Sequence, residues 1–219
     1  MKKYLFIFLI LIFVSGVEAQ EFKIIAGPII SNYSNRWPFG IIDPDFTFVI
    51  KDFKTGLLGG FGIEFTLNKN IAFELDALYF QKGINFVKYI PIMFSIKEIY
   101  NLHGFNFPMI VKIKPFPRPF PYILGGVQFS LILSHTRINL SNSPSGLEWQ
   151  ETSREDLIDV TEKVNFGPVF GLGFEIKVSR GILFLEGRHS IGLRNLLQHI
   201  YYSYKIKTRD LVIIIGFKI

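Results

Sequence analysis

The chain contains no cysteine among its 219 residues. Disulfide bonds, thiol nucleophiles, cysteine-ligated metal sites and lipid attachment to an N-terminal cysteine are therefore excluded. Beyond residue 19 the chain also lacks any run of apolar residues long enough for a transmembrane helix. Its 24 Lys and Arg outnumber its 18 Asp and Glu, giving a formal charge of +6. These cations form neither a basic helix nor a basic patch interleaved with aromatics, so no nucleic-acid partner is expected.

The first 19 residues have the pattern of a secretory signal. Two lysines follow Met1, an apolar run extends from Tyr4 to Val14, and the small residue Ala19 stands at the expected cleavage site. The apolar run is too short to cross a bilayer comfortably as a helix, although an uncleaved anchor is the alternative interpretation. We therefore predict a signal peptide at 1–19 and one exported domain at 20–219.

The clearest pattern in the exported part is the two-residue alternation of residues 164–193. One face of this stretch is apolar, and the other carries small, polar and charged residues, among them Glu175, Lys177, Glu186 and Arg188. A turn at 179–181 divides it into two halves. Because successive strand residues point to opposite faces, the stretch predicts a two-stranded ribbon with one apolar and one polar face.

Similar segments recur along the chain and predict eight strands, at residues 22–33, 56–67, 71–82, 105–114, 122–134, 164–178, 182–193 and 210–219. The connections between them alternate in length. Those at 68–70, 115–121 and 179–181 are short, and those at 34–55, 83–104, 135–163 and 195–209 are long. Short periplasmic turns and long extracellular loops are typical of outer-membrane barrels. The fold class predicted is therefore all-β: an eight-stranded antiparallel up-and-down transmembrane β-barrel with both termini in the periplasm.

Alternation alone leaves open which face lies inside. In a soluble barrel the apolar face would form the core, whereas in a membrane barrel it contacts lipid. The alternation of loop lengths favours the membrane barrel, in which polar side chains fill the lumen. The expected structural ion-pair network of the lumen comprises Glu64, Glu74, Asp76, Lys112, Lys114, Glu175, Lys177, Glu186 and Arg188. A proton path or ligand site is the alternative for these charges.

Three prolines and one predicted helix do not follow the regular pattern of strands and connections. Pro28, Pro108 and Pro168 fall inside predicted strands, where each removes a backbone donor from the sheet. In the long connection 135–163, Ser153 to Asp156 resembles a capping box and predicts a short helix with Leu157 and Val160 on one side.

No pattern for catalysis stands out. Of the four histidines, His103, His135 and His199 fall in or beside predicted loops, and His189 falls on the predicted lipid face. None has the spacing of a nucleophile with a base and an orienting partner. We predict no enzymatic activity, no catalytic or cofactor-binding residues, no metal site and no cofactor.

At the level of families, the chain resembles the PorT-like outer-membrane β-barrels. The resemblance rests on segments 60–64, 79–83, 122–126, 171–175 and 186–188, which begin with Gly-Phe-Gly-Ile-Glu at Gly60. It implies an eight-stranded barrel in the outer membrane and a link to type IX secretion. Such barrels tend to end in an aromatic residue, whereas this chain ends Phe217-Lys218-Ile219.

The sequence leads to three functional hypotheses. The first is a monomeric outer-membrane barrel with a plugged lumen and a structural, adhesive or secretion-accessory role through its extracellular loops. The second is a small pore or transporter, and the third is a barrel enzyme. Expected partners are outer-membrane lipid and lipopolysaccharide, the barrel-assembly machinery through the C-terminal strand, and secretion-system proteins.

Overall fold

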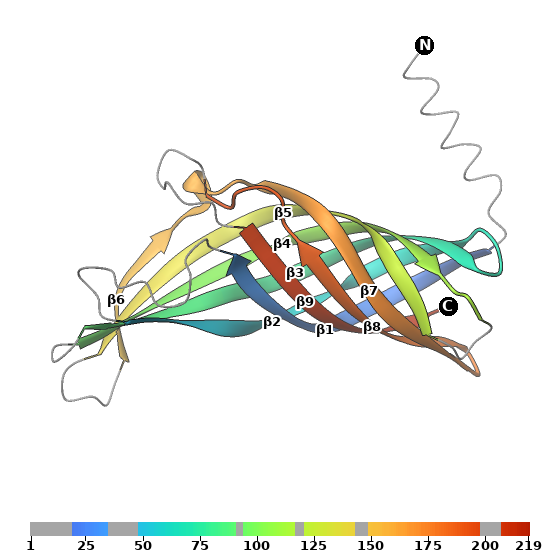
Figure 1. Ribbon diagram of the computed structural model, residues 1–219, viewed down its shortest axis with the longest axis horizontal. Helices are drawn as coiled ribbons and strands as arrows, with labels where there is room; N and C mark the ends of the chain where they lie inside the picture. The colour runs from blue at the N-terminus through green and yellow to red at the C-terminus, as the bar shows by residue number, and fades with distance from the viewer. Residues whose placement is uncertain (1–18, 35–47, 91–93, 117–120, 143–148, 198–206) are drawn as a thin grey trace, which may run out of the picture.

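The computed structural model describes residues 19–34, 48–90, 94–116, 121–142, 149–197 and 207–219. Eight long strands of these residues form a closed antiparallel barrel (Figure 1). They are β1 (Ala19–Ser34), β2 (Phe48–Thr66), β3 (Ile71–Ile90), β4 (Phe94–Ile113), β5 (Pro121–Asn142), β7 (Val164–Val178), β8 (Gly181–Ile191) and β9 (Lys207–Lys218). Each pairs with its neighbours in chain order, and β1 pairs with β9 to close the barrel. The predicted eight-stranded antiparallel up-and-down β-barrel is confirmed.

The barrel is apolar outside and partly charged inside, as β8 illustrates. Leu183 and Leu185 are 44% and 49% exposed, whereas Glu186 and Arg188 on the opposite face are 1% and 3% exposed. The same alternation of exposed and buried residues runs through β7 and β9. An apolar exterior of this extent would be costly in water, since apolar surface costs about 25 cal/mol per Å² when exposed. It is the surface expected to contact lipid.

The strands are longer than predicted, because several predicted loops continue the sheet. The connection 83–104 is largely strand: β3 and β4 stay paired from Gly83↔Asn101 to Ile90↔Phe94. The connection 34–55 contains the first part of β2, and β5 continues through the beginning of 135–163. Each strand continues as long as a partner strand lies beside it, because backbone groups that pair across the hairpin are satisfied there. Strands β2 to β5 therefore extend farther than the other strands at the end of the barrel opposite the C-terminus (Figure 1), past the exposed apolar residues Phe105 and Leu133.

The predicted helix beginning at Ser153 is wrong. A short strand, β6 (Trp149–Asp156), occupies this segment and pairs with the C-terminal part of β5. The Ser153 Oγ accepts a hydrogen bond of 2.8 Å from Asn139 Nδ2 across the strands instead of capping a helix. A single 3₁₀ turn follows, η1 (Ile158–Val160). Cross-strand pairing has overridden the local capping pattern.

The three prolines lie where pairing with one neighbouring strand is interrupted or begins. The β1–β9 pairs skip Gly27 and Pro28 between Ala26↔Ile215 and Ile29↔Val212 without a change of register. The β3–β4 pairs similarly skip Pro108, and the β7–β8 pairs begin one residue after Pro168. Each proline retains its pairing on the other side. A local gap in one ladder therefore accommodates the missing donor.

The start of β1 and the C-terminus lie at one end of the barrel (Figure 1). Phe22 and Ile219 exchange two backbone hydrogen bonds, of 3.0 and 2.9 Å. The tight β2–β3 and β7–β8 turns lie at this end, since they join the strand ends next to these residues. In the part of the chain that the structure describes, no helix is long and apolar enough to cross a membrane. The predicted signal peptide lies outside the described residues except for Ala19.

Candidate functional site: the charged lumen

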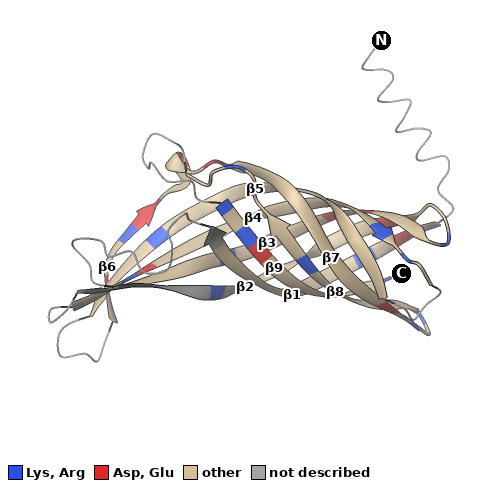
Figure 2. Cartoon of the chain, in the orientation of Figure 1, with Lys and Arg blue, Asp and Glu red and all other residues tan. Residues whose placement is uncertain are grey.

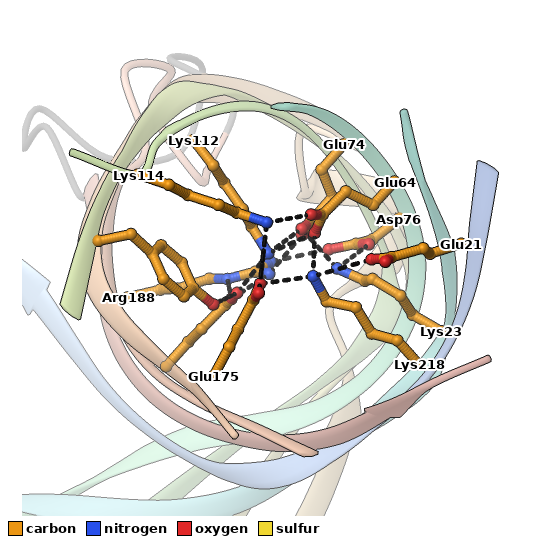
Figure 3. Close-up of polar contacts among 12 residues, drawn as sticks. Glu21, Lys23, Glu64, Glu74, Asp76, Lys112, Lys114, Glu175, Arg188 and Lys218 are labelled. Atoms are coloured by element: carbon orange, nitrogen blue, oxygen red, sulfur yellow. Dashed lines mark hydrogen bonds and ion pairs between the residues drawn. The ribbon is translucent and has the colours of Figure 1, made fainter. Parts of the chain in front are cut away.

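A cluster of charged side chains crosses the lumen near the end with the short turns (Figure 3). Every barrel strand except β5 contributes a charge, Lys114 follows directly after β4, and β5 contributes the hydroxyl of Tyr122. We call this set the lumen cluster. Its members are Glu21, Lys23, Glu64, Glu74, Asp76, Lys112, Lys114, Tyr122, Glu175, Glu186, Arg188 and Lys218.

Arg188 is one centre of the lumen cluster. Its guanidinium contacts Glu74 at 2.5 Å, Asp76 at 2.8 Å and Glu186 at 2.5 Å. The planar guanidinium presents several donors in fixed directions, which suits it to pairing with more than one carboxylate. The side chain is 4% exposed. Arg188 thus joins β8 to β3 across the lumen.

Lys112 is the second centre. Its ammonium contacts Glu64 at 3.0 Å, Glu186 at 2.6 Å and also Glu74. The Tyr122 hydroxyl donates a hydrogen bond of 2.5 Å to the same Glu186 oxygen. These contacts connect β2, β3, β4, β5 and β8. Burying one charge would be costly, but here each buried charge has several opposite partners.

Lys114 and Lys218 complete the cluster nearest the barrel end. Lys218 contacts Glu64 and Glu175, both at 2.5 Å, and Glu21 at 3.5 Å. Lys114 contacts the same Glu64 at 2.6 Å and Glu175 at 3.1 Å. Lys218 is the penultimate residue, so the last strand is anchored in the lumen as well as in the sheet.

An aromatic ring lies against the ammonium groups. Phe184 is buried, and its ring centroid is 5.1 Å from Lys23 Nζ, 5.4 Å from Lys112 Nζ and 5.7 Å from Lys218 Nζ. Cation–π attraction of this kind is stronger in a site that excludes water. Phe184 also belongs to an apolar cluster that fills the next part of the lumen, with Ile25, Leu78, Phe80 and Ile214. The lumen cluster therefore adjoins an apolar layer.

A second polar group lies beyond that layer. Lys82 Nζ is 2.6 Å from Asp210, and Ser31 Oγ donates a hydrogen bond of 2.7 Å to the same carboxylate. The inward residues of β3 show the sequence of layers along the barrel: Glu74 and Asp76, then Leu78 and Phe80, then Lys82, then Ile84. The lumen is filled by alternating charged and apolar layers, not by polar side chains alone.

The segments after β6 and β8 meet: Thr161 and Leu197 form an isolated antiparallel bridge, and Glu162 N donates a 2.9 Å hydrogen bond to Leu196 O. Leu196 is buried in the apolar cluster, and Ile158 of η1 packs against it. His135, on β5 beyond its last exposed apolar residue Leu133, shares a 2.7 Å hydrogen bond with Thr161 Oγ1. Burial lowers the pKa of His135 to about 4, against a smaller opposing effect of Asp156.

All of the predicted lumen residues except Lys177 lie in the lumen cluster. Lys177 is exposed, since it follows the last inward residue of β7, Glu175, and adjoins the exposed turn at 179–180. Its ammonium is hydrated there without any cost of burial. The cluster also contains four residues outside the predicted set, Glu21, Lys23, Tyr122 and Lys218, and Lys82 and Asp210 pair beyond it. Lys23 and Lys218 occupy inward positions near the ends of β1 and β9, so following the alternation to these ends would have identified both.

The charges of the lumen cluster contact one another. Among the residues that the structure describes, no group of three or more His, Asp or Glu is arranged to hold a metal ion. The lumen cluster links all eight strands of the barrel through its interior.

A closed barrel with an apolar exterior and an ion-paired interior is the architecture of an integral outer-membrane protein. The chain belongs to the family described as outer membrane protein beta-barrel domain, whose model matches residues 15–198. It is therefore an outer-membrane β-barrel protein. No curated protein matches the chain.

Several solved structures are similar in architecture. Ail, the attachment invasion locus protein of Yersinia pestis, in complex with the heparin analogue sucrose octasulfate, is 8% identical, with a TM-score of 0.44 over 91% of this chain and 99% of that one. OprG from Pseudomonas aeruginosa is 13% identical, with a TM-score of 0.40 over 93% and 98%. Neisserial surface protein A is 10% identical, with a TM-score of 0.39 over 92% and 100%. At TM-scores below 0.5, nothing about ligands is transferred from them.

Proposed function

We propose that this protein is a plugged, non-conducting barrel that acts through the part of the sheet and the loops outside the membrane. The single observation that carries the proposal is the filled lumen. Five cations and six carboxylates interlock across it, and an apolar layer adjoins them. An ion crossing this interior would have to displace paired charges and then pass buried apolar side chains, which is unfavourable.

Conductance in planar bilayers tests the plug. We expect the refolded protein to give no large, persistent openings, and such openings would overturn the proposal in favour of the pore hypothesis. Silence is informative only when the protein is folded and inserted. Heat-modifiable gel migration and protease protection of the same sample provide that control, since an unfolded chain gives neither.

The proposed orientation places the long connections and β6 outside the cell and both termini in the periplasm. Short periplasmic turns and long extracellular loops support it. Because the chain has no cysteine, single introduced cysteines report their side directly. A membrane-impermeant maleimide added to whole cells is expected to label Gln150→Cys on β6 but not Lys69→Cys in the β2–β3 turn. Both native residues are exposed, and the reverse labelling would overturn the orientation.

The role outside the membrane is proposed to be structural, adhesive or secretion-accessory, without an enzymatic step. The part of the sheet beyond the apolar surface supports a binding role, because β6 adds a paired strand there and is almost wholly exposed. The resemblance to PorT-like barrels makes secretion proteins one class of partner. Cross-linking from Gln150→Cys in native outer membranes, with Lys69→Cys as the matched control, tests this. A partner captured equally by both positions would count against a role for the exposed sheet.

A further inference from the structure

The lipid-facing apolar surface ends differently on the two sides of the barrel. At the end with the long connections, the first polar outward residue of β1, β2, β3 and β4 is uncharged in each case. These residues are Asn32, Thr55, Gln81 and His103. They follow outward apolar residues such as Leu57, Tyr79 and Phe105, which are 67%, 38% and 36% exposed. A cation, Lys54, adjoins Thr55 on this side, but it is only partly exposed and its ammonium donates a hydrogen bond to Asn101 Oδ1.

On the β7–β9 side, cations lie directly at the ends of the exposed apolar stretches. Lys163 directly precedes the exposed Val164 of β7, and Arg194 directly follows the exposed Leu193 after β8. On β9, Lys207 and Arg209 precede the exposed Leu211. In Figure 2 the start of β9 carries blue, basic segments, directly followed by a red, acidic one. We call these four residues the cationic border.

Backbone pairing brings the cationic border together. Ile191 of β8 pairs with Arg209, and Gly192 N donates a 2.8 Å hydrogen bond to Thr208 O. Leu193 N donates a 2.9 Å hydrogen bond to Phe166 O of β7. The strand ends that carry the four cations are therefore direct neighbours, and adjacent strands lie about 4.8 Å apart. Side chains as long as Arg and Lys can converge on one group over that distance.

Few negative charges offset them. Glu162 lies 3.6 Å from Arg194, but both side chains are about half exposed, and an exposed pair of this kind is weak. Asp210, between Arg209 and Leu211 in sequence, points into the lumen and binds Lys82. The outward side of the border thus keeps an excess of positive charge.

We propose that the cationic border binds the phosphate groups of an outer-leaflet glycolipid. The inference rests on the orientation proposed above, which places this border at the outer leaflet. Acyl chains would lie against the apolar outward residues of β7, β8 and β9, and the phosphates would meet the cations directly above them. Guanidinium groups suit phosphate because they donate two parallel hydrogen bonds. The phosphate groups of the glycolipid are expected on this side of the barrel.

The test compares lipids that differ only in phosphate. Refolded protein in zwitterionic phospholipid nanodiscs is titrated with bisphosphorylated lipid A, with dephosphorylated lipid A and with phosphatidylglycerol, and bound lipid is counted by native mass spectrometry. We expect the bisphosphorylated form to bind at least tenfold more tightly than the other two. Equal binding of the two lipid A forms would overturn the proposal. Binding of phosphatidylglycerol as tight as that of lipid A would overturn the assignment to a glycolipid.

A matched pair of triple variants locates the site. Arg194→Gln/Lys207→Gln/Arg209→Gln removes three cations of the border, and Lys69→Gln/Lys177→Gln/Arg180→Gln removes three exposed cations at the opposite end. Each cation near an anionic surface contributes about fivefold in affinity, so the border variant should lose tenfold or more. The control variant should keep wild-type affinity, and equal losses would refute the site. Both variants should retain heat-modifiable migration, since all six residues lie outside the lumen.

The outcomes are separable from those of the proposed function. Reversed cysteine labelling would refute the orientation while leaving the measured lipid binding in place. Conductance through the barrel would refute the plug without affecting either lipid result.

Discussion

Replacing Arg188 with methionine tests whether the lumen cluster holds the barrel together. Methionine keeps an unbranched side chain of similar length but removes the positive charge between Glu74, Asp76 and Glu186, which now lie within 2.8 Å of it. Breaking a buried ion pair by removing one partner costs about 3–5 kcal/mol, because the remaining charge stays desolvated. With three carboxylates affected, and with Lys23 and Lys112 still present to compensate, we expect a loss of about 3–5 kcal/mol in the free energy of unfolding.

Equilibrium urea unfolding in lipid vesicles, followed by heat-modifiable gel migration, measures this loss. The matched control is Lys177→Met, because Lys177 is a cation of the same sequence pattern that the structure leaves exposed. Surface substitutions usually change stability by less than about 0.5 kcal/mol. If both variants lost the same stability, the reasoning from buried ion pairs would be refuted. A cycle with Glu186→Gln should further give a coupling energy of about 0.5–3 kcal/mol.

Two further predictions concern packing and pH. A Cβ at Gly173 would lie 2.3 Å from the Tyr122 ring, so Gly173→Ala should lower the free energy of unfolding by about 1–3 kcal/mol. Gly187→Ala, where a Cβ meets nothing within 4 Å, should be nearly neutral, and the same urea assay compares the two. The pKa of His135 is lowered to about 4 in the folded state, so its contribution to stability is present above its unfolded pKa of about 6.5 and is lost as pH falls towards 4. His135→Gln should reduce the loss of stability over that interval by up to about 3 kcal/mol, and identical pH profiles would contradict this.

Much of the fold could be predicted from local pattern. The alternation in residues 164–193 predicts both strands and the turn between them, and the structure contains β7, β8 and a tight turn there. Strand ends were less predictable. Residues 83–104 were predicted to be a long connection, yet β3 and β4 remain paired to Ile90↔Phe94, because hairpin pairing depends on the partner strand as well as on the local sequence.

The lumen cluster, too, could be predicted only in part from the sequence. Inward parity identified Glu74 and Arg188 as facing the lumen, but it could not say that they touch, because β3 and β8 meet only across the closed barrel. The alternation of inward and outward residues wrongly predicted a buried side chain at the end of one strand. Lys177 has the same spacing from Glu175 as Arg188 has from Glu186, yet only Arg188 is enclosed by other strands.

The sequence by itself determined that this protein is a barrel with an apolar and a polar face, because strand alternation and connection length are local properties of the chain. Only the tertiary structure decided how the interior is occupied. Closure of β1 on β9 brings Lys218, at the end of the chain, to Glu64 and Glu175. Such contacts join residues far apart in sequence, so no local pattern encodes them. They depend on barrel closure, which sets the distances across the lumen.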